Sequence, residues 1–337
     1  MTTRATAYPR VALAGNPSDA FFGKTLALTF RNFAAVAEIC ASRRLELVLG
    51  DRFRESYLSV FTCLQDLGHN GYDREGSLLQ ATLKRFVDYA AETGLYVDGQ
   101  NFKLQCRSDI PREVGLGGSS AIVTACMRAL FSFFRLKVAP ATLANLVLSV
   151  ELEELGIPAG PQDRVVQAYD GLVYMDFSEE LIRRQGRGLY ERLDAAILPP
   201  LYVAYLTNRP ESSSVTHTDL HARFGRRDPA VMRAIQFWAD LTDQARQCLL
   251  LGNCRRFAAI MDANFDMRQQ VCRVNEDHYD LVLTARSAGA SAKFAGSGGA
   301  IVGVLEGSAM YDRLCAACDR IGARVLMPAL ENQEVPA

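Results

Sequence analysis

The sequence predicts an α+β protein with two domains. Its 337 residues exceed the size at which one hydrophobic core usually stops growing. Strand-like alternation and helix-like periodicity of apolar residues occur in both halves, without the regular strand–helix repeat of a parallel α/β sheet. Leu198-Pro199-Pro200 interrupts the pattern. We therefore expect a boundary within 180–200, with an N-terminal domain at 1–190 and a C-terminal domain at 191–337.

The first half combines short apolar strands with amphipathic helices. A proline at position 140 suits the start of a helix and Gly156 suits a C-terminal cap, so one helix is expected between them. Strands are expected at 11–14, 23–30, 45–49, 102–106 and 172–177, and helices at 77–91, directly after a glycine–serine loop near 115–120, at 140–155 and at 163–169.

The second half shows the same mixture, with longer helices. Strands are expected at 201–206, 292–294, 300–305 and 323–327, and helices at 229–251, 253–269, 276–288 and 310–321.

Charge and cysteine content exclude several classes of protein. The 37 basic and 38 acidic residues give a net charge of −1, which argues against a nucleic-acid partner or a membrane surface. We find no apolar run of about 18 residues, the length that a transmembrane helix needs, and the N-terminus has no secretory signal. Nine cysteines at irregular spacing predict free thiols in the reducing cytoplasm.

The run 111–125 is the most informative motif. Gly115, Gly117 and Gly118 precede Ser119 and Ser120, and a helix-periodic apolar stretch follows at once. Glycines allow close approach to a ligand, and a helix N-terminus presents unpaired N–H groups, so together they favour an anion such as phosphate. A loop in which one serine only caps the helix is the alternative.

Two further elements carry polar chemistry. A second glycine cluster at 293–300 predicts either a tight hairpin or a further set of phosphate donors, since a triphosphate needs donors from several sides. Glu151 precedes a Gly/Pro-rich bend, and Asp163 opens the next helix. These acids are either solvated or serve phosphoryl transfer, which needs a carboxylate for Mg²⁺ and often another for the substrate hydroxyl.

Taken in the order in which they occur along the chain, the motifs resemble those of the GHMP kinase superfamily, which is named for galacto-, homoserine, mevalonate and phosphomevalonate kinases. The run 111–121 is similar to the family's middle motif and 293–300 to its late glycine-rich loop. Arg10 and Asp19 have the spacing of the galactokinase first motif. The resemblance implies an N-terminal domain like ribosomal protein S5 domain 2 and a C-terminal ferredoxin-like α/β sandwich.

Within the superfamily, the chain is most similar to the glucuronokinase branch, which phosphorylates glucuronic acid at C1. Gly118 is an extra glycine that this branch shares, and Asn16-Pro17 stands where galactokinases carry Glu-His. The runs that carry this similarity are 15–19, 115–122, 162–165 and 175–178.

The resemblance implies a role for each matching residue. Asp163 would orient or deprotonate the anomeric hydroxyl, Arg10 would offset charge on the transferred phosphoryl group, and Asp19 would bind sugar hydroxyls. Mg²⁺ would be bound by Ser119, Ser120 and Glu151, with Glu153 and Glu154 as alternatives to Glu151. ATP would be bound by Gly115, Leu116, Gly117, Gly118, Ser119, Ser120, Gly296 and Gly298, and the substrate by Asp19, Asp163, Lys24 and Gly299.

The implied activity is ATP- and Mg²⁺-dependent phosphorylation of a small sugar acid, D-glucuronate, at its anomeric hydroxyl. Its carboxylate needs a cation, and the candidates are Lys24, Arg112, Arg164 and Lys293. Alternatives are kinases of galacturonate, arabinose, fucose, a heptose or galactose, and a sugar and nucleotide sensor without turnover.

Overall fold

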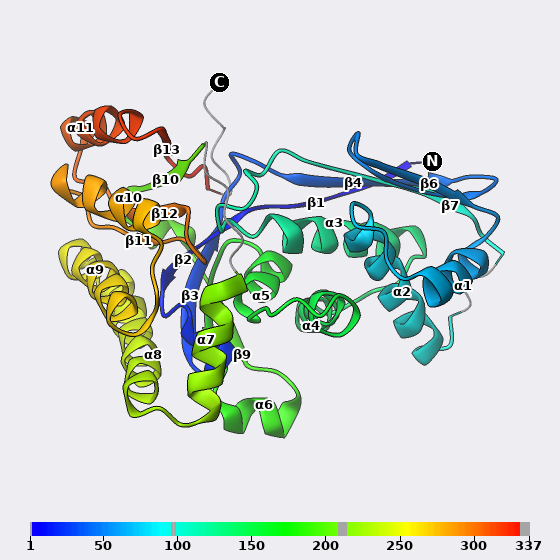
Figure 1. Cartoon of the computed structure of the whole chain (residues 1–337), viewed down its shortest axis with the longest axis horizontal. Helices are drawn as coiled ribbons and strands as arrows, with labels where there is room; N and C mark the ends of the chain where they lie inside the picture. The colour runs from blue at the N-terminus through cyan, green and yellow to red at the C-terminus, as the bar shows by residue number, and fades with distance from the viewer. Residues whose placement is uncertain (1, 96, 98, 208–213, 331–337) are drawn as a thin grey trace. The chain divides into compact units, whose positions relative to one another are not determined.

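The computed structural model describes residues 2–95, 97, 99–207 and 214–330 and has an α+β fold (Figure 1). The chain divides into two compact units, each made of several segments. The first unit comprises Met1–Pro9, Phe33–Ile110 and Gly118–Ala168, and the second comprises Arg10–Asn32, Pro111–Gly117 and Tyr169–Ala337. The continuous domains 1–190 and 191–337 stay a prediction, because the units are assembled from alternating stretches of chain.

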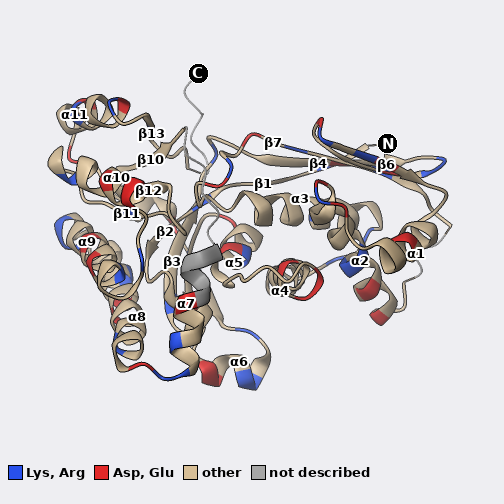
Figure 2. Cartoon of the chain, viewed as in Figure 1, with Lys and Arg blue, Asp and Glu red and all other residues tan. Residues whose placement is uncertain are grey.

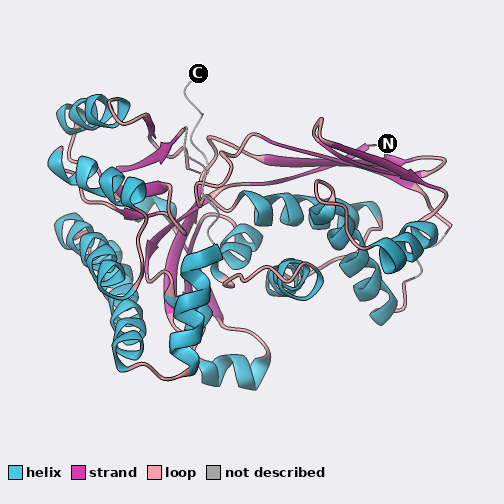
Figure 3. Cartoon of the chain, viewed as in Figure 1, coloured by secondary structure: helices cyan, strands magenta, loops and turns pink. Residues whose placement is uncertain are grey.

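The first unit is a five-stranded sheet with helices packed against one face, as Figure 3 shows. The strand order is β1-β4-β7-β5-β6, in which only the β5–β7 pair is parallel among the pairs described. The strands are β1 (Thr2–Ala7), β4 (Ala35–Ala41), β5 (Leu45–Leu49), β6 (Phe53–Tyr57) and β7 (Phe102–Ser108).

Helix α3 (Gly118–Phe133) contacts β1, β4 and β7 and forms the core of this unit, because most of its residues are apolar and buried. Helices α2 (Ser77–Glu92) and α4 (Pro140–Ser149) contact α3, and the other helices of the unit are α1 (Val60–Asn70) and α5 (Gln162–Tyr169). The helix expected at 140–155 is divided: α4 ends at Ser149, and Val150–Glu154 continues as a π-helical turn.

The second unit contains two four-stranded antiparallel sheets, ordered β2-β3-β8-β9 and β11-β12-β10-β13. The strands of the first of these sheets are β2 (Arg10–Ala14), β3 (Lys24–Thr29), β8 (Leu172–Asp176) and β9 (Leu189–Leu193). The strands of the other are β10 (Leu201–Leu206), β11 (Lys293–Phe294), β12 (Ala300–Val304) and β13 (Ala323–Leu326).

Helices pack on both sheets of the second unit. Helix α8 (Pro229–Leu250) contacts β2 and β3, and α9 (Cys254–Val271) contacts α8, β11 and β12. The remaining helices are α6 (Glu179–Gln185), α7 (Ser214–Gly225), α10 (Glu276–Ser287) and α11 (Ser308–Asp319). No helix in the described part of the chain is both long and apolar enough to span a bilayer.

Acidic and basic residues occur together on the exposed helices (Figure 2). On α6, for example, Arg183 pairs with Glu179 one turn earlier at 2.6 Å.

Candidate active site

The glycine–serine loop leads directly into helix α3, as the sequence predicts. Gly115 and Gly117 have φ values of +71° and +73°, which favour glycine, and the helix begins at Gly118. Ser119 in its first turn is exposed, whereas Ser120 is 1% exposed. The first turn of α3 therefore offers a solvent-accessible hydroxyl beside a helix N-terminus, which suits an anionic ligand.

In the second unit, the two glycine-rich loops lie side by side although they are far apart in sequence. The Arg10 backbone N–H donates to the Leu116 carbonyl at 3.0 Å, and its Nη1 donates to the carbonyls of Gly115 at 2.5 Å and Ala295 at 3.3 Å. A Cβ at Gly296 would come well under 3.0 Å from the Gly115 carbonyl. Arg10 thus joins the loops, and glycine is required where they touch.

The end of the second loop also depends on glycine. Gly298 and Gly299 have φ values of +147° and +79°. A Cβ would lie 2.5 Å from His278 Nδ1 at Gly298 and 3.0 Å from Val114 Cα at Gly299. By contrast, a Cβ at Gly118 would lie 3.6 Å from Ile110, an ordinary contact. The structure therefore explains the glycines of the late loop by packing, but not the extra glycine at 118.

In the first unit, the acids singled out from sequence lie together. Glu151 is 2% exposed and accepts hydrogen bonds from Arg164 Nε at 2.5 Å and from Arg164 Nη2. Arg164 Nη1 lies 3.8 Å from Asp163 Oδ2, and the Asp163 side chain is 16% exposed. One buried arginine thus lies between the candidate metal ligand and the candidate catalytic carboxylate.

The alternatives to Glu151 have different surroundings. Glu153 is exposed, whereas Glu154 accepts hydrogen bonds from Lys84 at 2.8 Å and Tyr72 at 2.5 Å. Burial alone would raise the pKa of Glu154, but the contacts with Lys84 and Tyr72 outweigh it and lower this pKa. Glu154 therefore serves the packing of α2 in this structure.

Asp19 and Lys24 flank the turn between β2 and β3. Asp19 is half-buried in the 3₁₀ turn Ser18–Phe21. Lys24 Nζ lies 2.7 Å from Asp243 and 3.5 Å from Asp176. Burial would lower the pKa of Lys24, but its hydrogen bond to Asp243 and nearby Tyr174 and Asp176 raise this pKa above its ordinary value. Lys24 is thus a cation with two carboxylate partners of its own.

Comparison with known proteins decides the family. Residues 78–171 match the family model described as the GHMP kinases N terminal domain. The chain is 36% identical to Glucuronokinase 1 of Arabidopsis thaliana over 303 residues, which are 88% of this chain and 83% of that protein. It is 37% identical to Probable glucuronokinase 2 of the same plant, over 88% of this chain and 82% of the relative.

The chain belongs to the GHMP kinase family. It is therefore a phosphotransferase with an alcohol group as acceptor. A crystal structure of Lactococcus lactis galactokinase complexed with galactose has the same fold, with a TM-score of 0.80 at 16% identity, covering 98% of this chain and 93% of the other. The predicted α+β, two-domain GHMP kinase fold is confirmed.

The kinase has few protein ligands for a metal ion. Among the described residues, no group of three His, Cys, Asp or Glu side chains could hold one. Mg²⁺ usually keeps several waters and binds one or two carboxylates plus substrate phosphates, so a hydroxyl and a single carboxylate fit its needs. Of the three residues implied for Mg²⁺, Ser119 is exposed, whereas Ser120 is buried and Glu151 already accepts hydrogen bonds from Arg164. These residues would therefore fit Mg²⁺ only together with phosphate oxygens.

The Glu151–Arg164 pair gives a prediction about stability. A Glu151→Gln variant should lose about 3 kcal/mol of unfolding free energy, because it removes the nearer of the two carboxylates that face the buried Arg164 guanidinium and leaves only Asp163 at 3.8 Å. Urea unfolding measures the loss. A double variant that also carries Arg164→Met should recover part of it, and a single-variant loss below about 1 kcal/mol would contradict the structural role of the pair.

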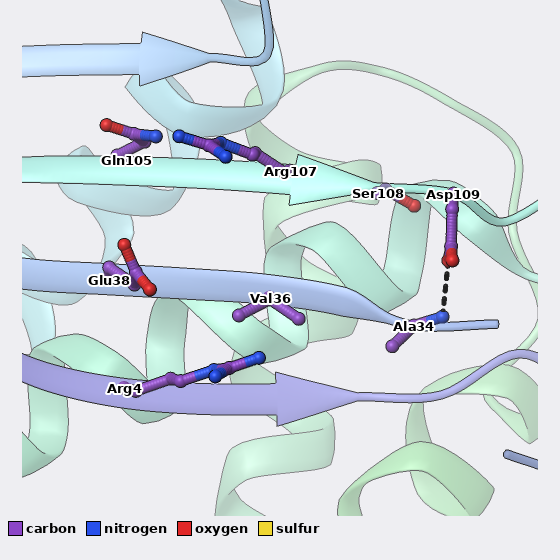
Figure 4. Close-up of a pocket in the computed structure, with 8 residues that line it drawn as sticks. All are labelled: Arg4, Ala34, Val36, Glu38, Gln105, Arg107, Ser108 and Asp109. Atoms are coloured by element: carbon purple, nitrogen blue, oxygen red, sulfur yellow. Dashed lines mark hydrogen bonds between the residues drawn. The ribbon is translucent and has the colours of Figure 1, made fainter.

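A pocket of about 360 Å³ lies elsewhere in the first unit, on the open face of the five-stranded sheet (Figure 4). None of the predicted site residues lines it. The lining residues are Arg4, Ala34, Val36, Glu38, Gln105, Arg107, Ser108 and Asp109.

Sequence reasoning missed Arg268 and Asn264 on α9, which bind the motif segments of the second unit. Arg268 donates to the carbonyls of Gly296 and Ser297, and Asn264 accepts from the Gly15 N–H at 2.6 Å. Both occur in an ordinary amphipathic helix, so no motif signals them.

Proposed function

We propose that this kinase transfers the γ-phosphoryl group of ATP to the anomeric hydroxyl of D-glucuronate, giving glucuronate 1-phosphate and ADP. The observation that carries the reaction class is the joining of the two glycine-rich loops by Arg10. The choice of glucuronate rests on the two plant relatives, which are called glucuronokinases and match over more than four-fifths of their length.

The proposed mechanism needs positioning and charge neutralisation more than covalent chemistry. Asp163 orients the anomeric hydroxyl and accepts its proton, which is easier than for an ordinary alcohol because this hydroxyl is more acidic. Arg10 offsets the charge on the transferred phosphoryl group, and Asp19 accepts hydrogen bonds from sugar hydroxyls. Gly299 contributes to the substrate side of the late loop.

Two bound groups take part in the proposed reaction. ATP is held by N–H groups of the two loops, at 115–120 and at 296–298. Ser119, Ser120 and Glu151 would hold Mg²⁺, which would neutralise phosphate charge. We also propose a cytoplasmic location, since all nine cysteines are free thiols, which suits a reducing compartment.

Among the four candidate cations, Arg112 is the partner that we propose for the substrate carboxylate. Arg164 is paired with Glu151, Lys24 with Asp243 and Asp176, and Lys293 is buried against three oxygen atoms. Arg112 is exposed and makes no ion pair or hydrogen bond within the described residues. It is therefore the candidate whose charge is still available to a ligand.

An Arg112→Met variant should raise KM for glucuronate roughly tenfold or more, because a charged hydrogen bond contributes about 1.5–3 kcal/mol. KM for ATP and the melting temperature should not change, since Arg112 has no partner among the residues that the structure describes. Steady-state kinetics with both substrates measure this. If Lys24→Met raises KM for glucuronate and Arg112→Met does not, Lys24 is the carboxylate partner.

A coupled ADP-release assay tests the proposed function. The sugars are glucuronate, galacturonate, arabinose, fucose, a heptose and galactose. The highest kcat/KM is expected with glucuronate, and a clear preference for another sugar would overturn the substrate assignment. Failure to turn over ATP with any sugar would favour a sensor.

A further inference from the structure

The loop 294–297 turns its carbonyl groups toward cationic side chains of the second unit. Arg268 Nη1 donates to the Gly296 carbonyl at 2.8 Å, and Nη2 donates to the Ser297 carbonyl at 2.9 Å. Its guanidinium also lies 5.0 Å from the centre of the Phe294 ring. The planar guanidinium of one buried arginine thus holds two successive carbonyls in a fixed direction.

Lys293 supports the same loop from its first residue. Lys293 Nζ donates to the carbonyls of Ala12 at 2.6 Å and Phe294 at 2.8 Å, and to Asn16 Oδ1 at 2.5 Å. It is 1% exposed. Asn16 in turn donates its Nδ2 to the Gly296 carbonyl at 3.4 Å. These contacts tie the start of the loop to β2 and the turn that follows it.

The direction of the carbonyls determines the direction of the N–H groups. In a trans peptide, the C=O of one residue and the N–H of the next point in opposite directions. Because Arg268 holds the carbonyls of Gly296 and Ser297, the N–H groups of Ser297 and Gly298 point away from Arg268. Two successive N–H groups on one side form a concave site for an anion.

These N–H groups have no acceptor in the described part of the protein. The N–H groups of Gly296, Ser297, Gly298 and Gly299 donate no hydrogen bond to any described residue. The three glycines are nevertheless buried. More than nine in ten buried backbone N–H groups in proteins are paired, so several adjacent ones without a partner indicate a ligand.

Charge around the loop also favours an anion. Neither Arg268 nor Lys293 forms an ion pair within the described residues, and Arg268 Nε is buried without a hydrogen-bond partner. Burial lowers the pKa of Lys293 well below its ordinary value, and the charges of Arg268 and Arg10 lower it further. Burial also lowers the pKa of Arg268, and the Asp19 carboxylate counteracts this only in part. Because the positive groups around the loop outnumber this carboxylate, a bound anion would offset the remaining charge.

We propose that Arg268 and Lys293 are positioning residues of the kinase reaction, which hold the loop 296–299 so that its N–H groups bind phosphate oxygens. The role rests on the proposed kinase function. Both residues act through the loop backbone, because their side chains are engaged with carbonyl oxygens. The loop would then contribute donors to the transferred phosphoryl group without any charged side chain at the point of contact.

An Arg268→Lys variant tests the proposal. Lysine keeps the charge but cannot hold two neighbouring carbonyls in a planar arrangement. We expect kcat/KM for ATP to fall roughly 10- to 100-fold, mainly through kcat, because N–H donors that stabilise a transition state are displaced. Lys293→Arg keeps the charge but not the size. Its kcat should fall less than that of Lys293→Met when both variants are folded.

Arg286→Lys is the matched control. Arg286 lies 5.4 Å from the Phe265 ring centre and donates to the carbonyls of Asp262 and Ala292, which is the same type of contact that Arg268 makes. Unlike Arg268, it is partly exposed, pairs with Asp262 and Asp266, and donates to no carbonyl of the loop 296–299. Its variant should lose less than about threefold in kcat/KM with a similar change in melting temperature. Equal activity losses in the two variants would overturn the proposal, as would Arg268→Lys activity within twofold of the control.

A binding measurement separates this proposal from the proposed function. Tripolyphosphate should raise the melting temperature of the wild type and of Arg286→Lys. It should raise the melting temperature of Arg268→Lys much less. Kinetics are run with whichever sugar the wild type phosphorylates, so a wrong sugar assignment leaves this test intact. Equal stabilisation of all three proteins by tripolyphosphate would count against the positioning role, even if the enzyme proves to be a glucuronate kinase.

Discussion

An Asp163→Asn variant is expected to lose about 10³-fold in kcat while its KM for ATP stays within about threefold of the wild type. Asparagine has the same shape but cannot accept the proton of the anomeric hydroxyl. Asp163 opens helix α5, keeps part of its side chain exposed, and has the Arg164 guanidinium 3.8 Å away. It is therefore held in place and remains accessible to a substrate.

Single-turnover and steady-state kinetics at saturating ATP measure the loss. The matched control is Asp88→Asn on α2, where the carboxylate is partly exposed and paired with Lys84 at 3.0 Å. The control should keep its kcat, since an exposed ion pair contributes at most about 1 kcal/mol to stability. If Asp163→Asn keeps more than about a tenth of the wild-type kcat, Asp163 is not the proton acceptor.

A Gly296→Ala variant is expected to lower kcat/KM for ATP by roughly 100-fold or more and to destabilise the fold by about 2 kcal/mol. The new methyl group would meet the Gly115 carbonyl and both terminal nitrogens of Arg10, all closer than 3.0 Å. The Gly115 carbonyl and Arg10 Nη1 are the groups whose hydrogen bond helps to hold the glycine-rich loops together. The loops must therefore separate to admit a single carbon atom.

Gly225→Ala is the control for this experiment. Gly225 ends helix α7, and a Cβ there would have no heavy atom within 4 Å. That variant should keep wild-type kinetics and stability within about 0.5 kcal/mol. Denaturant unfolding together with ATP kinetics decides the matter, and wild-type kcat/KM in Gly296→Ala would show that the close approach of the two loops has no part in activity.

Much of the fold could be predicted from local pattern. The strand at 45–49 and the helices at 77–91, 229–251 and 276–288 lie within a residue or two of their predicted bounds, because each has a clear apolar period. The α+β class and the two-domain family fold also follow from the sequence. The order of three motifs along the chain was enough to indicate a GHMP kinase.

Elements without a clear apolar period were missed. Strand β1 is largely Thr, Arg and Ala with one face exposed, and β6 reads Phe-Arg-Glu-Ser-Tyr, so neither shows a strong apolar alternation. Helix α1 begins with a Ser59–Thr62 capping box, which uses threonine in place of the usual Glu or Gln. The π-helical turn at Val150–Glu154 gives no sequence signal either, although it carries Glu151.

The sequence by itself determined the family and indicated which residues are candidates for phosphate contact, because the need for glycine, for hydroxyls at a helix start and for a carboxylate is a local requirement of backbone and chemistry. Tertiary structure alone decided their partners. It paired Glu151 with Arg164 and brought Arg10 to both glycine-rich loops. It also placed Arg268, which belongs to no motif, against the carbonyls of the second loop. These contacts affect stability because the groups are buried. A buried charge or N–H group without a partner is unfavourable, and only the folded chain or a ligand can supply that partner.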